Sequence, residues 1–351
     1  MRILFISNDG FDASLSRVPL SNWFYRNKKW VIDILSPRGH CMDLDAGICY
    51  ELQNRGINWS NLCKINNTIK HNGYDLIIAR GIESIILLSL SKTGRSKCFF
   101  LLTGLGRLFD KRLFCKVVIR FIYRNLLKLM IGFKKSHVIL QNEDDAHDLR
   151  LENYHLMNGS GFPSVITNNH YSGHKTNTIL TATRLSLSKG LKSIIDLAEY
   201  IVDNRLSLNY VILGDYNHLP DSYIRKIKKL NQSTNIRFVG FDSDTDKYFV
   251  NSQFSFFPTM YREGAPRFLI QSLSHGLIIF TNPEPGCSHT ISNKNGYLYS
   301  SVETMVNQIF ELQKSPKELS NLRNRSIELF EKVYKDERVY EKLFQFLSYG
   351  K

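Results

Sequence analysis

The chain has 351 residues, a formal net charge of +14, 43% hydrophobic residues and 22% charged residues. This composition excludes a disordered or fibrous chain, and the length predicts two globular domains. No run of about 18 uninterrupted apolar residues is present, so no transmembrane helix is predicted, and the apolar start of the chain ends at Asn8, too early for a secretory signal.

Five short apolar runs in the first half predict parallel strands that are buried on both faces, with helices between them. They lie at 2–7, 30–35, 74–79, 97–102 and 137–141. Alternation of such runs with helical spacers is typical of right-handed βαβ units. The loop after the first run contains a single glycine, Gly10, so the G-x-G-x-x-G pattern of dinucleotide-binding folds is absent.

The segment 92–135 is strongly basic, with twelve Lys or Arg residues and one acid, Asp110, so it carries 11 of the 14 excess positive charges. Five of its basic residues recur every four positions, which places them on one stripe of a helix: Arg112, Lys116, Arg120, Arg124 and Lys128. A basic amphipathic helix suits an anionic bilayer surface. An ordinary domain helix with a solvated basic face is the alternative. No recognised nucleic-acid module accompanies the charge, so no nucleic acid is predicted as a partner.

A second series of apolar runs follows the polar stretch 167–177. It lies at 178–183, 210–213, 236–239, 254–257 and 277–281. The sequence therefore predicts two doubly wound α/β domains, 1–165 and 166–332, and a C-terminal helix in 333–351 that packs back on the first domain. Ligands of such sheets bind beyond the carboxyl ends of the strands, and we expect the site in the cleft between the two domains.

The segment 257–276 is the most informative part of the sequence. A strand ends at Phe257, a short loop carries Glu263 and Gly264, and Pro266 opens a helix that Gly276 ends. The free N–H groups of a helix N-terminus suit a diphosphate, and a carboxylate just before it can accept hydrogen bonds from sugar hydroxyls. The alternative is that Glu263 only stabilises the start of the helix.

The six cysteines predict no metal site. They lie at 41, 49, 63, 98, 115 and 287 and form no C-x-x-C pair. The group of His40, Cys41, Cys49 and Cys63 is too loosely spaced for a typical metal pattern. Reduced thiols of a cytoplasmic protein are the better interpretation.

The segment 257–276 resembles the E-x7-E motif of family 4 glycosyltransferases, usually seen as S-x-x-E-G-x-P-x-x-x-L-E-A-x-x-x-G. Glu263, Gly264, Pro266 and Gly276 match the motif, and Ala265 lies within it. Gln271 departs from it, because the family has a second Glu there, which binds the ribose of the nucleotide. A neutral Gln can still donate and accept hydrogen bonds, so donor binding can survive with altered preference.

Three further segments match the family in the expected order, and the last of them is Glu284–Cys287 followed by Asn295–Leu298, which resembles the usual loop and N-G-x-L ending. Arg184, followed by Lys189, resembles its A-R-L-x-x-x-K-G element, in which the two cations neutralise the donor diphosphate. Gly214 lies in a strand-end turn that resembles, more weakly, the glycine-containing turn of the family. The resemblance implies catalytic roles for Arg184, Lys189 and Glu263. It supplies no convincing catalytic base.

The first half shows a looser resemblance to the transferases that act on lipid-linked oligosaccharides. Arg17 lies in an R-x-P-L element after the first strand, and Gly104 and Gly106 form a G-L-G loop after the fourth. The subgroup includes the enzyme that adds N-acetylgalactosamine to a diphospho-undecaprenol-linked sugar. The resemblance therefore implies that Gly10, Arg17, Gly104 and Gly106 lie on the acceptor side, although ordinary turns are the alternative.

The resemblance as a whole implies a GT-B fold, in which two Rossmann-like domains face each other across a cleft. It implies a retaining transfer of a hexose or N-acetylhexosamine from a nucleotide-diphosphate sugar, expected to be a UDP-sugar, without a cofactor or an essential metal. The acceptor would be a polyprenyl-diphosphate-linked glycan of a bacterial surface polysaccharide, such as O-antigen or capsule. We expect a cytoplasmic protein, peripheral on the inner face of the cell membrane. The alternative is a non-catalytic subunit of the same fold, which binds sugar or lipid and supports a partner transferase; Gln271 is its best argument.

Overall fold

The computed structural model describes residues 1–9, 16–37, 43–53, 55–109, 116–164 and 177–349, and the statements below concern these residues. The chain divides into two compact units. Unit 1 comprises Met1–Gly161 and Asp336–Lys351, and unit 2 comprises Phe162–Lys335. The sequence predicted the corresponding divisions at 165/166 and 332/333. Gly10 and Arg112 lie outside the described residues.

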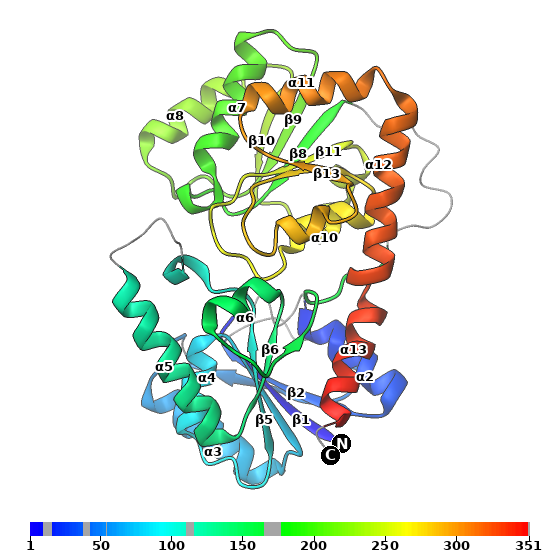
Figure 1. The fold of residues 1–351 in the computed structure, drawn as a ribbon. Helices are drawn as coiled ribbons and strands as arrows, with labels where there is room; N and C mark the ends of the chain where they lie inside the picture. Colours follow the sequence, from blue (N-terminus) through cyan, green and yellow to red (C-terminus); the bar gives the residue numbers. More distant parts are fainter. Residues whose placement is uncertain (10–15, 38–42, 54, 110–115, 165–176, 350–351) are drawn as a thin grey trace. The chain divides into compact units, whose positions relative to one another are not determined.

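Unit 1 contains a seven-stranded parallel sheet in the order β3-β2-β1-β4-β5-β6-β7 (Figure 1). The strands are β1 Arg2–Ser7, β2 Val31–Pro37, β3 Cys49–Leu52, β4 Leu76–Arg80, β5 Lys97–Leu102, β6 His137–Leu140 and β7 His155–Leu156. The helices are α2 Val18–Lys28, α3 Trp59–Asn72, α4 Ile82–Leu90, α5 Val117–Lys134, α6 Glu143–Leu149 and α13 Asp336–Tyr349.

Successive residues of each strand in unit 1 point to opposite faces of the sheet, as the two-residue period of a strand requires. Ile3 and Phe5 of β1 pack in one core with α2 and α13. Leu4 and Ile6 pack in the other core, with α3, α4 and α5. The helix α13 thus belongs to unit 1, although it is the last element of the chain.

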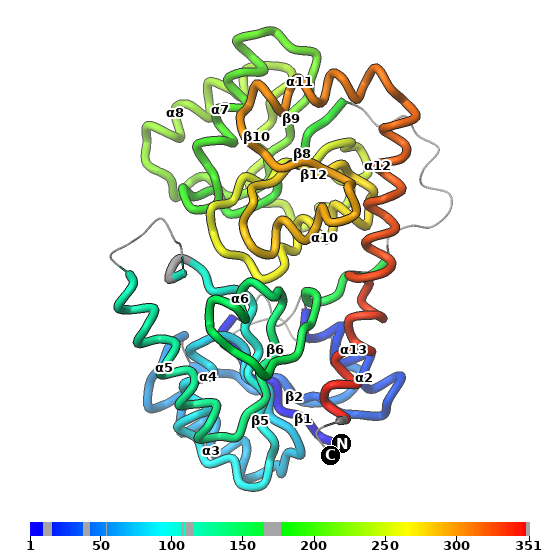
Figure 2. Tube along the Cα trace, viewed as in Figure 1, coloured from blue at the N-terminus to red at the C-terminus, as the bar shows by residue number. Residues whose placement is uncertain are grey.

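Unit 2 contains a six-stranded parallel sheet in the order β10-β9-β8-β11-β12-β13 (Figure 2). The strands are β8 Thr178–Ala182, β9 Asn209–Leu213, β10 Ile236–Gly240, β11 Phe254–Phe257, β12 Ile278–Thr281 and β13 Gly296–Leu298. The helices are α7 Leu191–Asp203, α8 Asp221–Leu230, α9 Asp246–Val250, α10 Arg267–Ser274, α11 Val302–Gln313 and α12 Pro316–Leu329, and a π-helical turn, Phe330–Tyr334, follows α12.

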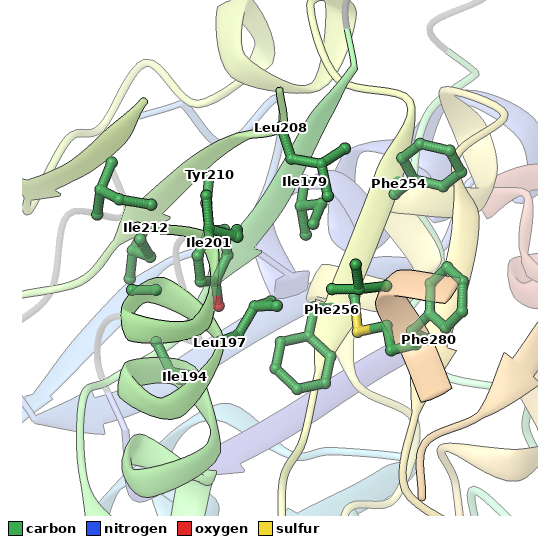
Figure 3. Packing of buried hydrophobic residues seen from close by; sticks show 14 of the residues in the cluster. Ile179, Ile194, Leu197, Ile201, Leu208, Tyr210, Ile212, Phe254, Phe256 and Phe280 are labelled. Atoms are coloured by element: carbon green, nitrogen blue, oxygen red, sulfur yellow. The ribbon is translucent and has the colours of Figure 1, made fainter. Parts of the chain in front are cut away.

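The sheet of unit 2 is also covered on both faces. Figure 3 shows one core, in which Ile194, Leu197 and Ile201 of α7 pack against residues of the strands. The other core contains Leu180 of β8 and Phe257 of β11, together with residues of α10. The prediction of two parallel-sheet Rossmann-like α/β domains is therefore confirmed.

Each of the ten predicted strands is present, with ends within two residues of the predicted bounds. The sequence missed β3, β7 and β13, which are edge strands of two to four residues. Their residues are mostly exposed or half-buried, so they lack the continuous apolar run that marks a central strand.

Candidate functional site

The strand order of unit 2 reverses direction beside β8. The chain runs outward from β8 to β9 and β10 on one side, and continues with β11, β12 and β13 on the other. The loops that follow β8 and β11 therefore leave neighbouring strands at the same edge of the sheet. This is the position at which parallel α/β sheets bind their ligands.

The loop after β8 packs directly on the loop after β11. The backbone N–H of Met260 donates to the carbonyl oxygen of Ser188 over 3.0 Å. Gly190 has a φ of +81°, and a Cβ atom there would lie 2.1 Å from the carbonyl oxygen of Pro258. Only glycine permits this approach, so the K-G pair of the sequence has a structural reason.

These two loops bring Lys189 and Glu263 together, although they are 74 residues apart in the sequence. The Lys189 ammonium is in direct contact with the Glu263 carboxylate, and the side chains are only 11% and 16% exposed. The Lys189 Nζ also lies 4.5 Å from the centroid of the Tyr261 ring. A partly desolvated ion pair therefore stands at the carboxyl ends of β8 and β11.

The loop after β12 contacts the loop that carries Glu263. Asn282 donates to the carbonyl oxygens of Pro258 and Thr259 over 3.1 and 3.0 Å. Gly286 lies against the backbone of Glu263 and Gly264, because a Cβ atom there would be 2.5 and 2.3 Å from their carbonyl oxygens. These contacts fix the backbone that carries Glu263.

Cys287 follows Gly286 in the chain and is fully buried. Burial raises the pKa of its thiol well above the usual value, and the nearby Glu263 carboxylate acts in the same direction. The thiol is therefore neutral at physiological pH. Cys287 belongs to a buried apolar core of unit 2 and is poorly suited to act as a nucleophile.

The helix α10 begins directly after Ala265 and Pro266, as the sequence predicted. Pro266 is its N-cap residue, and no acidic residue lies in its first turn. Ile270 donates to the carbonyl oxygen of Pro266, so the N–H groups of residues 267–269 come before the first hydrogen bond within the helix. The helix ends at Ser274, and Gly276 has the positive φ of +64° that is typical after a helix.

Arg184 and Gly214 lie in the loops that follow β8 and β9. Arg184 follows β8 and is exposed. Gly214 follows β9, and a Cβ atom there would lie 2.1 Å from the carbonyl oxygen of Thr183. The loop after β9 is thus packed against the segment that carries Arg184. Arg184, Lys189 and Glu263 all lie at one edge of one sheet.

Gln271 contacts Asp246, a residue that the sequence did not indicate. Its side-chain amide donates to Asp246 Oδ1 over 2.8 Å and to Thr245 Oγ1 over 3.3 Å. The imidazole of His275 is buried, and its Nε2 lies 3.9 Å from Asp246 Oδ1. A glutamate at position 271 would face the Asp246 carboxylate, and the two negative charges would repel each other.

The residues assigned to the acceptor side lie in unit 1. Arg17 is only 1% exposed, and its guanidinium lies 4.7 Å from the centroid of the Phe5 ring. Gly104 and Gly106 follow β5 and have positive φ angles of +109° and +60°. These residues follow β1 and β5, at the carboxyl edge of the sheet of unit 1.

Four residues of the basic stripe are described, and they differ in their surroundings. Arg124 donates its Nε to the carbonyl oxygen of Asp148 over 2.6 Å, and its guanidinium lies 5.6 Å from the centroid of the Phe109 ring. Lys116 and Arg120 are half-buried, and Lys128 is exposed. Arg124 therefore anchors α5 to its own unit.

No cluster of three or more His, Cys, Asp or Glu side chains suited to a metal ion occurs within the described ranges. Among these same residues, no helix has the length and apolar character needed to cross a bilayer.

The sequence profile of the family "Glycosyl transferases group 1" matches residues 165–329. No curated protein sequence matches the chain at a significant level. Several solved structures share its fold over nearly the whole length. HepE from Anabaena, in complex with UDP and glucose, has a TM-score of 0.78 and 14% identity over 99% of both chains. Sucrose-phosphate synthase from Thermosynechococcus elongatus has a TM-score of 0.77 and 15% identity over 99% of this chain and 98% of that chain.

A third structure, TarM, has a TM-score of 0.76 and 14% identity over 98% of both chains. At these identities the structures show the fold, which is GT-B, and the sequence profile shows the domain. The chain therefore carries a glycosyltransferase group 1 domain in its second unit and is a glycosyltransferase.

Proposed function

We propose that this chain transfers a hexose or N-acetylhexosamine from a UDP-sugar to a polyprenyl-diphosphate-linked glycan, with retention of the anomeric configuration. The acceptor would belong to a bacterial surface polysaccharide such as O-antigen or capsule. The protein would act in the cytoplasm, peripherally on the anionic inner face of the cell membrane. The observation that carries the proposal is the convergence of Lys189 and Glu263 beside the start of α10.

The donor side of the proposal rests on the charges at the carboxyl edge of the unit 2 sheet. When the bond between C1 of the sugar and the diphosphate breaks, the departing oxygen takes the electron pair, while the acceptor hydroxyl forms the new bond to C1 and its proton passes to the departing diphosphate. Arg184 and Lys189 would stabilise that charge, and the N–H groups at the start of α10 would bind the phosphate oxygens. We propose that no metal ion or cofactor is essential, because the two cations can supply the positive charge that this step needs.

Glu263 would bind the hydroxyl groups of the transferred sugar. Its carboxylate is held by Lys189, and its backbone is fixed by the loop after β12. Because the Glu263 carboxylate is already held in place as a hydrogen-bond acceptor, little reorganisation is needed when the sugar binds. The complexes of HepE with UDP and with UDP-glucose support a UDP-sugar as the donor class.

The acceptor side of the proposal rests on unit 1 and on the R-x-P-L and G-L-G resemblances, and the basic segment 92–135 would hold the protein at the bilayer that carries the acceptor. A lipid-linked diphosphate would explain a need for both positive charge and apolar surface. The retained stereochemistry rests on the resemblance of residues 178–300 to family 4.

The test is turnover by the purified protein. We expect release of UDP from one member of a UDP-sugar panel when a detergent-solubilised polyprenyl-diphosphate glycan is added. Mass spectrometry and NMR of the product would give the added sugar and its anomeric configuration. Activity that persists in EDTA is expected; complete and reversible loss in EDTA would reject the metal-independent step, and an inverted product would reject retention.

The alternative is a non-catalytic subunit of the same fold, which the departure at Gln271 favours. It predicts UDP-sugar binding without turnover by the isolated chain, and turnover only when a partner transferase is added. Mass spectrometry of lipid-linked glycans from a deletion strain, complemented with Glu263→Gln, separates the two. A catalytic role predicts that this variant leaves the glycan one sugar short, whereas the subunit predicts a glycan of full length.

A further inference from the structure

The helix α5 exposes most of its apolar side chains. Of its 18 residues, Leu127 and Met130 are the two that are buried. Eight large apolar side chains are between 43% and 75% exposed: Val117, Val118, Ile119, Phe121, Ile122, Leu126, Leu129 and Phe133. Packing within unit 1 therefore uses only a small part of the apolar surface of this helix.

The exposed side chains form one continuous face. Val118, Ile122, Leu129 and Phe133 are separated by four, seven and four residues, which is the spacing of neighbours on one side of a helix. The buried Leu127 and Met130 lie outside this face. An ordinary domain helix has the reverse arrangement, with the apolar stripe inward, and an exposed apolar face of this size marks an interaction site.

The orientation of α5 is fixed by polar contacts near its middle and at its C-terminal end. Near the middle, Arg124 donates to the carbonyl oxygen of Asp148. At the end, Lys134 donates its Nζ to the carbonyl oxygen of Ser91 over 2.6 Å. The second contact brings the end of α5 beside the exposed Lys92. The apolar face is therefore held outward by the structure of unit 1.

The charges around this face have one sign. Within α5, four basic residues occur and no acid: Arg120, Arg124, Lys128 and Lys134. Lys135 follows the helix and is exposed. A surface that combines a broad apolar face with cations, and with no acid on the helix, complements an anionic lipid bilayer. A protein partner is less suited, because the core of a protein interface is depleted in lysine.

We propose that α5 lies in the interface of an anionic bilayer, with Phe121, Leu129 and Phe133 inserted among the lipid chains and Lys128 and Lys135 at the headgroups. The inference rests on the proposed function, because an acceptor anchored in a bilayer has to be reached at the bilayer surface. It goes beyond that function by assigning the contact to one helix and to insertion of apolar side chains as well as to charge.

The test is co-sedimentation with two kinds of vesicle at low and high salt. One kind contains phosphatidylcholine alone, and the other contains equal parts of phosphatidylcholine and phosphatidylglycerol. Wild type is expected to bind the anionic vesicles more tightly at low salt, and to keep a weaker, salt-resistant association with both kinds, because salt screens charge but not apolar insertion.

The apolar variant carries Phe121→Ser, Leu129→Ser and Phe133→Ser. It is expected to bind both kinds of vesicle at least about tenfold more weakly, since each large side chain loses its transfer from water. The matched control is Phe241→Ser in unit 2, because Phe241 is 72% exposed and Phe133 is 75% exposed. The control is expected to bind like wild type.

The charge variant carries Lys128→Gln and Lys135→Gln. It is expected to lose about tenfold or more on anionic vesicles at low salt, and little at high salt. Its control carries Lys228→Gln and Lys229→Gln on α8, two exposed lysines of unit 2. Equal binding by the apolar variant and wild type would overturn the insertion, and so would loss of binding in both controls.

A second outcome would also overturn the proposal. If wild type binds neither kind of vesicle and elutes as a dimer that the apolar variant converts to a monomer, the face is an interface between copies of this chain. Binding is measured without donor or acceptor, and turnover is measured separately on a solubilised acceptor. If wild type does not bind vesicles but shows normal turnover, the proposed contact of α5 with the bilayer is rejected, whereas the proposed function is not contradicted.

Discussion

The helices α10 and α5 show how differently the two units use a helix. Six of the eight residues of α10 are buried, and its N-terminal end continues the loop that carries Glu263. In α5, two of 18 residues are buried, and the outer side is apolar. A helix packed on nearly all sides holds a polar site rigidly. A helix packed on one narrow side leaves apolar side chains exposed to water, which costs free energy. Contact of those side chains with another apolar phase would remove this cost.

The contrast predicts that the polar contacts of unit 2 control chemistry and that the surface of unit 1 does not. The expected effects of unit 2 variants run from loss of turnover to small changes in stability. None of these variants should change vesicle binding, and none of the α5 variants should change turnover on a solubilised acceptor.

The largest effect is expected from Glu263→Gln. Removing the carboxylate should lower turnover by about a hundredfold or more, because a preorganised contact to the reacting sugar is lost. Affinity for UDP should stay within a few-fold of wild type or rise, because a negative charge is removed from beside Lys189. Initial rates and calorimetric titration of UDP measure the two quantities. Glu303→Gln, on the first turn of α11, is the control, and near-normal turnover of Glu263→Gln would reduce Glu263 to a structural role.

The next effect concerns stability. Lys189→Met leaves the Glu263 carboxylate without its cation at a site where both side chains are largely buried. Breaking a buried pair in this way costs up to about 3–5 kcal/mol, whereas removing both charges costs less. Urea unfolding should therefore show that Lys189→Met with Glu263→Gln is more stable than Lys189→Met alone. A double variant that is the less stable of the two would show that the pair does not couple.

A third effect is expected from Arg184→Ala. Arg184 is exposed, so its removal should leave stability unchanged. If its guanidinium binds the diphosphate, the lost charge-assisted hydrogen bond should weaken UDP binding by roughly 1.5–3 kcal/mol. Calorimetric titration of UDP measures this, with Arg225→Ala on α8 as the control. Unchanged UDP affinity would remove Arg184 from the donor site.

The sequence predicted the central strands because each is an apolar run buried on both faces, and it missed β3, β7 and β13 because edge strands lack such runs. It predicted that Lys189 and Glu263 belong to one site, because each lies in a motif that follows a strand. It could not give their direct contact, since that depends on the close approach of Gly190 to Pro258. The sequence showed that α5 is basic and apolar but not which side faces outward, because either side could have packed on unit 1.

The sequence did not indicate Asp246 as a residue of the site region. Asp246 lies 25 residues before Gln271, at the start of α9, and no spacing rule connects the two positions. The contact arises only because α9 and α10 pack in the same core of unit 2. It predicts an electrostatic reason for the amide at 271, which the comparison with the family motif left open.

The smallest effect is therefore expected from Gln271→Glu, the change that restores the usual motif. The amide that donates to Asp246 Oδ1 over 2.8 Å would be replaced by a second carboxylate. Because the Asp246 side chain is 58% exposed, water screens the repulsion, and the loss of stability should be about 1 kcal/mol at low salt and less at high salt. Adding Asp246→Asn should restore the stability, because the asparagine amide can donate to the new carboxylate. Urea unfolding of the two single variants and the double variant gives the coupling energy directly. If Gln271→Glu is as stable as wild type at low salt, the contact with Asp246 does not explain the departure from the motif, and only the function of the residue at 271 can.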